Sequence, residues 1–592
     1  MKRVMMVLFC FFMTFVFVRE TKGEYKGIDI LLHQKIRMSD GTNLSANIFK
    51  PAEMKEPLPA IFTFTPYVAD EGQQRGTFFA QNGYVYVHVD VRGRGNSQGK
   101  FLPIEKDGPD GAQVVQWLAK QPWCNGKVAM RGGSYRGMVQ WQILKNFPAA
   151  LKTIVPTAAP APGIDAPKDR NIFISVFATW LAFTKGKTKN TELGSDYLYW
   201  MNKIYKTYSQ YLPFSTLAEV TCSRPEIFKR WLSHPYYDDY WQNISLSDED
   251  YKRIDIPILT ITGYFDENQP GALHYFRKHM QFGKSHIKEK HYLIIGPWSH
   301  AGTRKPQKEL AGMVFAENAV LNIDQLHLEW FDWILKEKEK PKFLEKRICY
   351  YVMKENKWKY QDRLKDASNQ TITWYLSSEK GKANDIFHSG YLEQTLPTKK
   401  QEPDVFRYDP LKIISRDEYF KSNSSLLDQG AAFREDKLIY HSPPLKEDIE
   451  ITGRVKLTAY IQLNVPDTDL RVDLYEIKPD GKSIRLAWDF MRARYRDSLS
   501  KPELVIPGTI NKYVFNKSHF FARKLEKGSR LRLILSCLNH PFFEKNYNSG
   551  GVVAEETGKD ARTAVIKLYH NKKYPSVLEL PIHVFKANKP KK

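Results

Sequence analysis

The sequence of 592 residues predicts a mixed α/β domain with a helical insertion, followed by an all-β domain. Strand and helix patterns alternate over residues 24–164 and resume over 251–344, which indicates a largely parallel sheet with crossover helices. Residues 165–250, between these two stretches, are helical and rich in Trp and Tyr. Over 345–592, short alternating strand segments recur between turns, a spacing typical of a β-sandwich or jelly roll.

The α/β part begins with a predicted hairpin. Apolar residues alternate on both sides of Asp40-Gly41, a dipeptide that favours a tight turn between antiparallel strands. Runs of Val, Ile, Phe and Tyr then suit strands that are buried on both faces. In chain order, the next predicted elements are a strand, a helix, a strand and a helix, over 59–67, 73–83, 84–93 and 107–122.

The predicted sheet continues on both sides of the insertion. Residues 127–148 pass from a short strand through a glycine-bearing turn into a helix. After the insertion, apolar runs over 256–266 and 288–300 restore strand character. The all-β part shows the same alternation in several short segments, among them 454–463, 470–477 and 531–538.

A targeting signal occupies the first residues. Lys2 and Arg3 form a positive start, and residues 4–18 are apolar without a charge. This run is at the upper limit for a signal peptide and shorter than the roughly 20 residues of a membrane-spanning helix. We therefore expect a signal peptide over 1–23 and a secreted or periplasmic protein without stable membrane insertion after cleavage. An uncleaved N-terminal anchor is the alternative.

Charge and cysteine content exclude several classes of protein. The formal charge is +23, and removing 1–23 takes away four basic residues and one acidic residue, which leaves a basic chain. Lys and Arg alternate with Asp and Glu along the whole length, so a solvated basic surface is favoured over a nucleic-acid partner. The remaining cysteines lack metal-ligand spacing, although one or two bridges are compatible with an oxidising compartment. They are Cys124, Cys222, Cys349 and Cys537.

The glycine-bearing turn contains the motif Gly-x-Ser-Tyr-x-Gly around Ser134. A hydroxyl is a poor nucleophile at neutral pH, so a protein must hold it beside a base and direct dipoles at the oxyanion that forms. Gly132 and Gly133 permit a sharp turn, and Gly137 lets the following helix approach the sheet. With a strand before it and a helix after it, Ser134 is predicted to be a catalytic nucleophile. The alternative is a glycine-rich turn that serves packing alone.

A carboxylate and a histidine follow in the order that such a nucleophile requires. Asp266 ends the run over 256–266, just past its strand, and His300 likewise ends the run over 288–300. We predict that His300 is the general base and that Asp266 orients it. The alternative for Asp266 is a helix N-cap, and the alternative for His300 is an ordinary loop histidine.

Two tyrosines are candidates for stabilising the oxyanion. The backbone N–H of Tyr135 lies at the start of the helix after Ser134, where it points toward developing negative charge. Tyr67 follows an earlier strand and carries a hydroxyl that can donate a second hydrogen bond. Taken alone, Tyr67 is equally consistent with a packing aromatic.

Other polar residues near these strands give weaker signals. Asp238 and Asp239 could form a second carboxylate cluster, but a structural surface pair is favoured. Several histidines lie between Asp266 and His300 without metal-ligand spacing. They are His274, His279, His286 and His291.

The motifs resemble those of the family that contains bacterial cocaine esterase, the α-amino-acid ester hydrolases and the X-prolyl dipeptidyl aminopeptidases. The similar segments run from about residue 30 to the C-terminus and include FTPY, DVRGRGNSQG, GGSYRG, HPYYDDYWQ, TGYFDENQPGALHYF and GPWSH. The resemblance implies an α/β-hydrolase domain with a helical cap and a C-terminal jelly roll. It also implies a Ser134, His300 and Asp266 triad, oxyanion donors at Tyr67 and Tyr135, and no metal or organic cofactor.

The substrate is less defined than the mechanism. Relatives that take α-amino acyl esters place two further carboxylates shortly after the catalytic Asp, whereas here only Glu267 is acidic and Asn268, Gln269 and Pro270 follow. We expect an esterase or amidase with a small acyl substrate, and a peptidase that releases X-Pro dipeptides is the second hypothesis. A glycan-binding protein with a decayed hydrolase domain is the non-enzymatic alternative. The sequence leaves the oligomeric state open, a homo-oligomer included.

Overall fold

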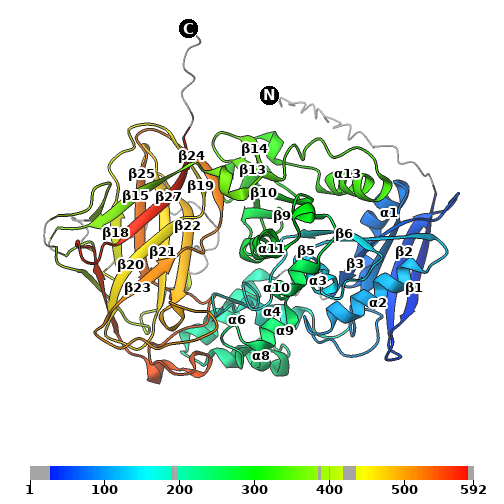
Figure 1. Cartoon of the computed structure of the whole chain (residues 1–592). Coiled ribbons are helices and arrows are strands. Elements are labelled where there is room, and N and C mark those ends of the chain that lie inside the picture. The colour runs from blue at the N-terminus through cyan, green and yellow to red at the C-terminus, as the bar shows by residue number, and fades with distance from the viewer. Residues whose placement is uncertain are drawn as a thin grey trace, which may run out of the picture.

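The computed structural model of the chain describes residues 27–188, 194, 196–379, 381–384, 389–398, 401–417 and 435–584. An α/β part lies at one end of the molecule, a β-rich part lies at the other, and a group of helices lies below and between them (Figure 1). The predicted signal peptide over 1–23 falls outside the described residues. Within those residues, no helix has both the length and the apolar character needed to cross a membrane.

A ten-stranded mixed sheet forms the α/β part. Its strand order is β1-β2-β4-β3-β5-β6-β9-β10-β13-β14, and the strands from β4 to β13 pair in parallel. The predicted parallel sheet is thereby confirmed, as is the hairpin at Asp40-Gly41, which joins antiparallel β1 and β2. The strands are β1 Ile28–Arg37, β2 Asn43–Pro51, β3 Leu58–Thr65, β4 Val85–Asp90, β5 Cys124–Gly133, β6 Leu151–Thr157, β9 Ile258–Phe265, β10 His291–Ser299, β13 Ile348–Val352 and β14 Lys357–Gln361.

Helices cover both faces of this sheet. On one face lie α2 (Asp107–Ala119), α3 (Tyr135–Leu144) and α11 (Gln269–Phe282), and the opposite face is covered by α1 (Gln73–Gln81) and α13 (Ile323–Lys336). Trp141 of α3 stacks on Tyr275 of α11 with ring centroids 4.6 Å apart. Both faces of the central strands β3, β4, β9 and β10 are therefore buried, which explains their continuous apolar runs.

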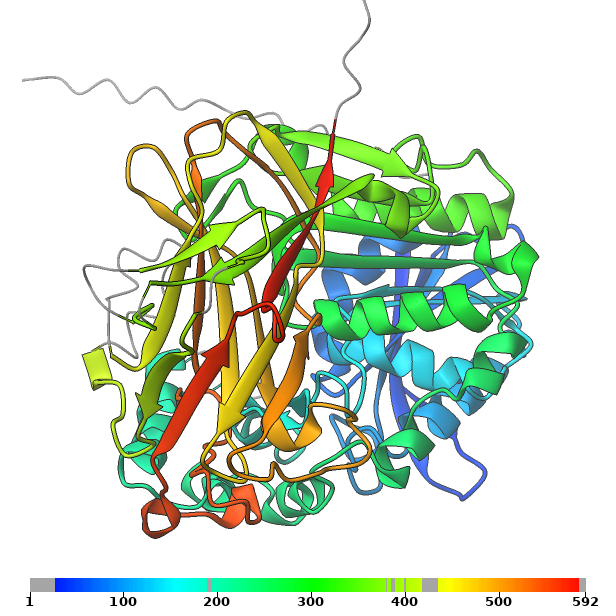
Figure 2. The same cartoon turned by 60° about the vertical axis from the view of Figure 1, so that its left-hand side comes forward.

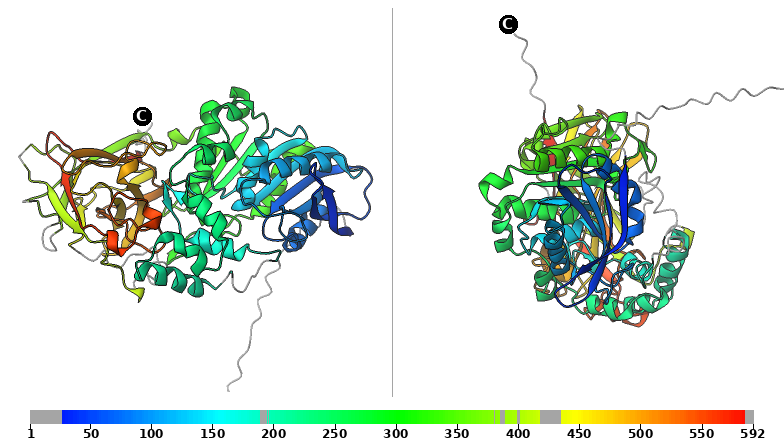
Figure 3. Two further views of the ribbon diagram at one scale, coloured as in Figure 1. Left: turned by 90° about the horizontal axis from the view of Figure 1, so that it is seen from below. Right: turned by 90° about the vertical axis from the view of Figure 1, so that its right-hand side faces the viewer.

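The insertion lies between β6 and β9. Its helices are α4 Val176–Phe183, α6 Tyr197–Ser209, α7 Leu217–Val220, α8 Pro225–Leu232, α9 Asp239–Ile244 and α10 Asp248–Arg253. This segment contacts the β-rich part through backbone hydrogen bonds, for example from Ser175 N to Phe542 O at 2.9 Å and from Tyr237 N to Leu499 O at 3.0 Å. Figure 3 shows, from below, the helices of the insertion beside both larger parts of the molecule.

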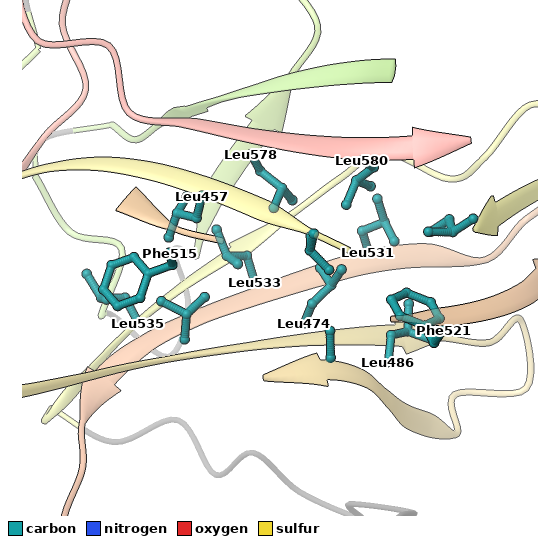
Figure 4. Packing of buried hydrophobic residues seen from close by; sticks show 14 of the residues in the cluster. Leu457, Leu474, Leu486, Phe515, Phe521, Leu531, Leu533, Leu535, Leu578 and Leu580 are labelled. Carbon is teal, nitrogen blue, oxygen red and sulfur yellow. The ribbon is translucent and has the colours of Figure 1, made fainter. Parts of the chain in front are cut away.

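The β-rich part is a thirteen-stranded sheet arrangement in which neighbouring strands are antiparallel except β16 and β18. Its strands are β15 Gln370–Ser377, β16 Gly390–Glu393, β17 Asp404–Tyr408, β18 Lys437–His441, β19 Ile449–Gly453, β20 Lys456–Leu463, β21 Asp469–Ile477, β22 Ser483–Arg492, β23 Ile510–Phe515, β24 Phe521–Leu525, β25 Arg530–Cys537, β26 Ala564–Tyr569 and β27 Val577–His583. Figure 2 shows the long strands of this part next to the α/β part. Leucines from separate strands meet in its core, as Figure 4 shows for Leu474, Leu533 and Leu578.

The hydrogen bonds place the end of the α/β sheet later than the boundary expected between 344 and 345. Strand β13 pairs in parallel with β10, and β14 returns antiparallel to β13. Residues up to Gln361 thus belong to the first sheet. Sequence pattern alone does not separate these strands from those that follow, because both sets are short.

Truncation of the β-rich core is expected to destabilise the protein. Leu533 is fully buried, and replacing it by alanine removes apolar contacts and leaves a cavity. For Leu533→Ala we expect a loss of about 2–5 kcal/mol in the free energy of unfolding. Urea unfolding of the full chain measures this loss. Leu504, which is 45% exposed, supplies the matched control, and an equal effect of Leu504→Ala would contradict the assignment of this core.

Candidate active site

Ser134 sits at the turn between β5 and α3 in a strained backbone conformation. Its φ is 62° and its ψ is −129°, a combination that non-glycine residues rarely adopt. The turn is tight: a Cβ on Gly132 would lie 2.6 Å from Arg136 Cβ, and a Cβ on Gly137 would lie 2.8 Å from Thr157 O. The glycines of the motif are therefore required by close packing, and the turn presents the serine at the carboxyl edge of the sheet.

Asp266 and His300 lie at the same edge, after two neighbouring parallel strands. Phe265 at the end of β9 pairs with Ser299 at the end of β10, so the residues that follow are adjacent. His300 Nδ1 and Asp266 Oδ1 are 2.8 Å apart. Because Nδ1 faces the carboxylate, Nε2 is the nitrogen left for other partners.

Asp266 is completely buried, and two further groups hold its carboxylate. Thr262 Oγ1 donates to Oδ2 at 2.8 Å, and the backbone N–H of Asn268 donates to Oδ1 at 3.1 Å. Burial by itself raises the pKa of Asp266, but the hydrogen bonds and the charge of His300 outweigh burial and bring the pKa below its ordinary value. The N-cap alternative for Asp266 is wrong, since the N-cap of α11 is Asn268.

The loop after His300 packs directly against the turn that carries Ser134. A Cβ on Gly133 would lie 2.6 Å from Arg304 Cδ, so the chain segments before Ser134 and after His300 are in contact. Among the hydrogen bonds of the described residues, none joins Ser134 Oγ to His300. Catalytic hydrogen bonds are often long in ligand-free enzymes and shorten when substrate binds.

Trp180 of α4 connects the two predicted oxyanion donors. Its Nε1 donates to Tyr67 Oη at 3.1 Å, and its ring stacks on Tyr135 with centroids 5.4 Å apart. Tyr67 thus accepts a hydrogen bond from Trp180 and keeps its own hydroxyl proton for another acceptor. The N–H of Tyr135 is among the first of α3, and such groups have no acceptor within their helix.

Tyr135 is fixed by its side chain. Its hydroxyl donates to Asp107 of α2 and accepts from the N–H of Ile104 at 2.9 Å. Burial raises the pKa of Asp107 to about 7, with Tyr135 and Ile104 opposing the rise. This contact joins α2 to the first residue of α3 and so holds the start of that helix in place.

Glu267 is an additional carboxylate beside the Asp266 and His300 pair. Ligand atoms of these three residues all lie within 4.8 Å of one another. Glu267 is exposed, yet desolvation by the surrounding protein raises the pKa of its carboxyl. The charge of His300 opposes this rise, and the charge of Asp266 adds to it. His300 already uses Nδ1 for Asp266, so the group consists of an acid–imidazole pair with a neighbouring acid.

The other polar residues singled out in the sequence have separate roles. Asp238 Oδ2 lies 2.6 Å from His234 Nδ1 within the insertion, and Asp239 begins α9. The Nδ1 atoms of His279 and His291 are 2.8 Å apart, and His286 Nε2 is hydrogen-bonded to Asp255 Oδ1. Within the described residues, none of these histidines belongs to a group with metal-ligand geometry. The four cysteines Cys124, Cys222, Cys349 and Cys537 are free.

Several residues of the site have no local sequence signal. Thr262 lies within an ordinary buried strand, and Trp180 is one of many aromatics in the insertion. Arg304 lies in a loop and is followed by Lys305 and Lys308. Their proximity to Asp266, Tyr67 and Gly133 arises from contacts between distant parts of the chain, so spacing along the sequence could not indicate them.

Comparisons with known proteins agree with this architecture. Residues 40–302 match the family model described as X-Pro dipeptidyl-peptidase (S15 family), and residues 342–579 match the model of the X-Pro dipeptidyl-peptidase C-terminal non-catalytic domain. Cocaine esterase from Rhodococcus sp. (strain MB1 Bresler) is 26% identical over 578 residues, which cover 92% of this chain and 97% of that protein.

Two solved structures share the fold along nearly the whole chain. An aminopeptidase from a marine sediment Thaumarchaeota archaeon has a TM-score of 0.80 at 21% identity and covers 94% of this chain and 97% of its own. An α-amino acid ester hydrolase has a TM-score of 0.80 at 20% identity and covers 97% of this chain and 100% of its own. The chain is therefore a serine hydrolase and belongs to the family that includes cocaine esterase and the X-Pro dipeptidyl-peptidases.

Proposed function

We propose that the protein is exported and hydrolyses acyl ester or amide bonds of small substrates, with Ser134, His300 and Asp266 as a catalytic triad. The observation that carries this proposal is the hydrogen bond between buried Asp266 and His300, located at the sheet edge where the strained turn presents Ser134. The non-enzymatic glycan-binding alternative is not retained, because the family comparisons support a serine hydrolase.

The mechanism follows from the roles of these side chains. His300 Nε2 accepts the proton of Ser134 Oγ as the oxygen attacks the substrate carbonyl, and the carboxylate of Asp266 stabilises the imidazolium. The hydroxyl of Tyr67 and the N–H of Tyr135 donate to the oxyanion. His300 then protonates the departing alcohol or amine, which leaves the acyl group on Ser134. Water that His300 deprotonates attacks this acyl group and releases Ser134.

We propose further that the helical segment over 165–250 acts as a cap and that the C-terminal β-rich part is a jelly roll that helps enclose the site. The contact between Trp180 of the cap and Tyr67 supports this arrangement. The hydrogen bonds from the insertion to Phe542 and Leu499 support a fixed position of the cap against the β-rich part.

An X-Pro dipeptidyl-peptidase is the second candidate, since both family models carry that description. Within the proposed site, Glu267 is the carboxylate that could receive a substrate ammonium. Parallel assays with an aryl ester and a Gly-Pro anilide separate the two candidates. Turnover of the anilide alone would overturn the esterase proposal, whereas ester turnover without the anilide would exclude the peptidase.

Removal of the nucleophile is expected to abolish activity. For Ser134→Ala we expect a fluorophosphonate probe to lose its labelling and kcat for an aryl ester to fall on the order of 10⁶-fold, because no acyl-enzyme can form. Ser285→Ala, at an exposed position, is the matched control. Labelling that persists in Ser134→Ala would place the nucleophile elsewhere.

Removal of the negative charge of Asp266 is expected to lower kcat and to change how the stability of the fold depends on pH in the acidic range. In Asp266→Asn, kcat should fall by about 10⁴-fold because the amide does not hold the required tautomer of His300.

The folded-state pKa of Asp266 lies below its ordinary value of 3.8. Its stabilising contribution is therefore complete above pH 3.8 and is lost as pH falls from there through the folded-state pKa.

Unfolding in urea across the acidic range measures this contribution. The wild type should lose stability more steeply than Asp266→Asn as pH falls below 3.8. Asp362, whose side chain is 63% exposed, provides the control substitution Asp362→Asn. Identical pH slopes for wild type and Asp266→Asn would contradict an ionised, hydrogen-bonded Asp266.

The hydroxyl of Tyr67 is expected to act on the transition state. Tyr67→Phe should lower kcat by about 10²- to 10³-fold with little change in KM, because the lost hydrogen bond forms only as the oxyanion develops. Steady-state kinetics on an aryl ester measure the two constants separately. Tyr391→Phe, at a residue that is 45% exposed, is the control. A change confined to KM would indicate that Tyr67 only packs against substrate.

A further inference from the structure

A basic cavity adjoins the backbone that leads to Ser134. It lies against Gly132 and Gly133 and has a volume of about 20 Å³. Since a cavity needs roughly 10–15 Å³ to hold one water molecule, this one has room for about one water-sized group, such as one oxygen of a carboxylate. Four arginines line the cavity, and they are Arg75, Arg131, Arg136 and Arg304.

Two of these arginines share one carboxylate. Arg131 Nη2 lies 2.6 Å from Asp324 Oδ1, and Arg75 Nε lies 3.3 Å from the same oxygen. Arg131 also donates from Nε to His327 Nδ1 at 3.0 Å. A single acidic side chain therefore serves two guanidinium groups on one side of the cavity.

Arg136 and Arg304 have no such carboxylate. Within the part of the chain that the structure describes, Arg136 Nε and Arg304 Nη1 are buried and have no hydrogen-bond acceptor. Arg136 lies over the ring of Tyr67 at 5.6 Å. The charges of Asp266 and Glu267 raise the pKa of Arg304, but neither carboxylate forms an ion pair with it. Asp266 is already hydrogen-bonded to His300. Burial lowers the pKa of both arginines, which reflects the cost of enclosing the charges.

A deeply buried histidine also faces this cavity without a partner. His88 is 2% exposed, and neither of its ring nitrogens has a hydrogen-bond partner among the described residues. Nδ1 is directed at Gly72 in the cavity wall, where a Cβ would approach it to 2.0 Å. Burial lowers the pKa of His88 to about 3, so the ring is neutral at pH 7 and can donate one hydrogen bond.

Positive charge predominates in the lining of the cavity, which contains four arginines and the carboxylate of Glu71. Asp324 is shared by Arg75 and Arg131, and the charges of Asp266 and Glu267 act on Arg304. Buried N–H groups without an acceptor are unfavourable, and the planar guanidinium fork matches a carboxylate in two-point contacts. We propose that this cavity binds a carboxylate between Arg136 and Arg304, presented either by a small free acid or by an acidic group of the substrate.

Binding of a free acid is tested without reference to catalysis. The thermal unfolding midpoint of the full chain is measured in sodium acetate and in sodium adipate, each against sodium chloride at equal ionic strength. We expect the carboxylates to raise the midpoint of the wild type. In Arg136→Gln and Arg304→Gln the apparent affinity should fall by about 10- to 100-fold, because each variant loses a charged hydrogen bond.

Two further variants keep this test interpretable. Arg363→Gln changes an exposed arginine that pairs with Asp366 and does not line the cavity, and this variant should bind carboxylates like the wild type. Arg304→Lys retains a charge but not the fork, so its affinity should lie between those of the wild type and Arg304→Gln. Circular dichroism and fluorophosphonate labelling report whether each variant is folded.

An acidic group on the substrate is tested with two matched esters. The 4-nitrophenyl esters of hexanoate and of adipate differ only in the carboxylate at the end of the acyl chain. If the substrate supplies the carboxylate, kcat/KM of the wild type should favour the adipate ester, and Arg136→Gln and Arg304→Gln should reduce this preference by about 10- to 100-fold. This arm rests on the proposed hydrolase reaction, and turnover of the hexanoate ester reports that reaction on its own.

The outcomes are distinct. A carboxylate-dependent midpoint that the two glutamine variants lose supports a site for a free acid, and a lost preference for the adipate ester supports a substrate subsite. If carboxylates do not stabilise the wild type and the ester preference is absent or unchanged in folded variants, the proposal is overturned. If the protein hydrolysed neither ester, the proposed hydrolase function would be overturned. The thermal unfolding midpoints would still decide whether the cavity binds a carboxylate.

Discussion

The hydrogen bond between Asp266 and His300 depends on the parallel pairing of β9 with β10. Because these strands are neighbours in register, the residues that follow their last paired positions emerge side by side at one edge of the sheet. Asp266 is fully buried there and receives hydrogen bonds from Thr262 and Asn268 as well as from His300. These donors keep a carboxylate ionised in a place where burial alone would favour its neutral form.

The turn around Ser134 depends on the same sheet edge. Its backbone conformation is strained, and such strain persists only where surrounding contacts determine the conformation. Gly137 lies against Thr157 of β6, and Gly133 lies against Arg304 of the loop after His300. The serine turn and the histidine loop are thus packed against each other, so a change in one is expected to displace the other.

The insertion and the basic cavity both adjoin the proposed catalytic residues. Trp180 brings the insertion to Tyr67 and Tyr135, where the transition state would form. Arg136 and Arg304 lie on the chain segments that carry Ser134 and His300. Substrate preference is therefore expected to depend on groups that surround the proposed catalytic residues, and the proposed carboxylate site is one such group.

The sequence by itself determined the parallel sheet, the β-rich second part and the positions of Ser134, Asp266, His300, Tyr67 and Tyr135 as candidates. Periodicity, glycine spacing and the presence of a polar residue just after a strand are local properties, and each can be identified within a few neighbouring positions. Only the tertiary structure decided that β13 and β14 extend the first sheet, that Trp180 joins the two tyrosines and that arginines from four segments surround one cavity. These features depend on contacts between residues far apart in the chain, for which no local pattern is required.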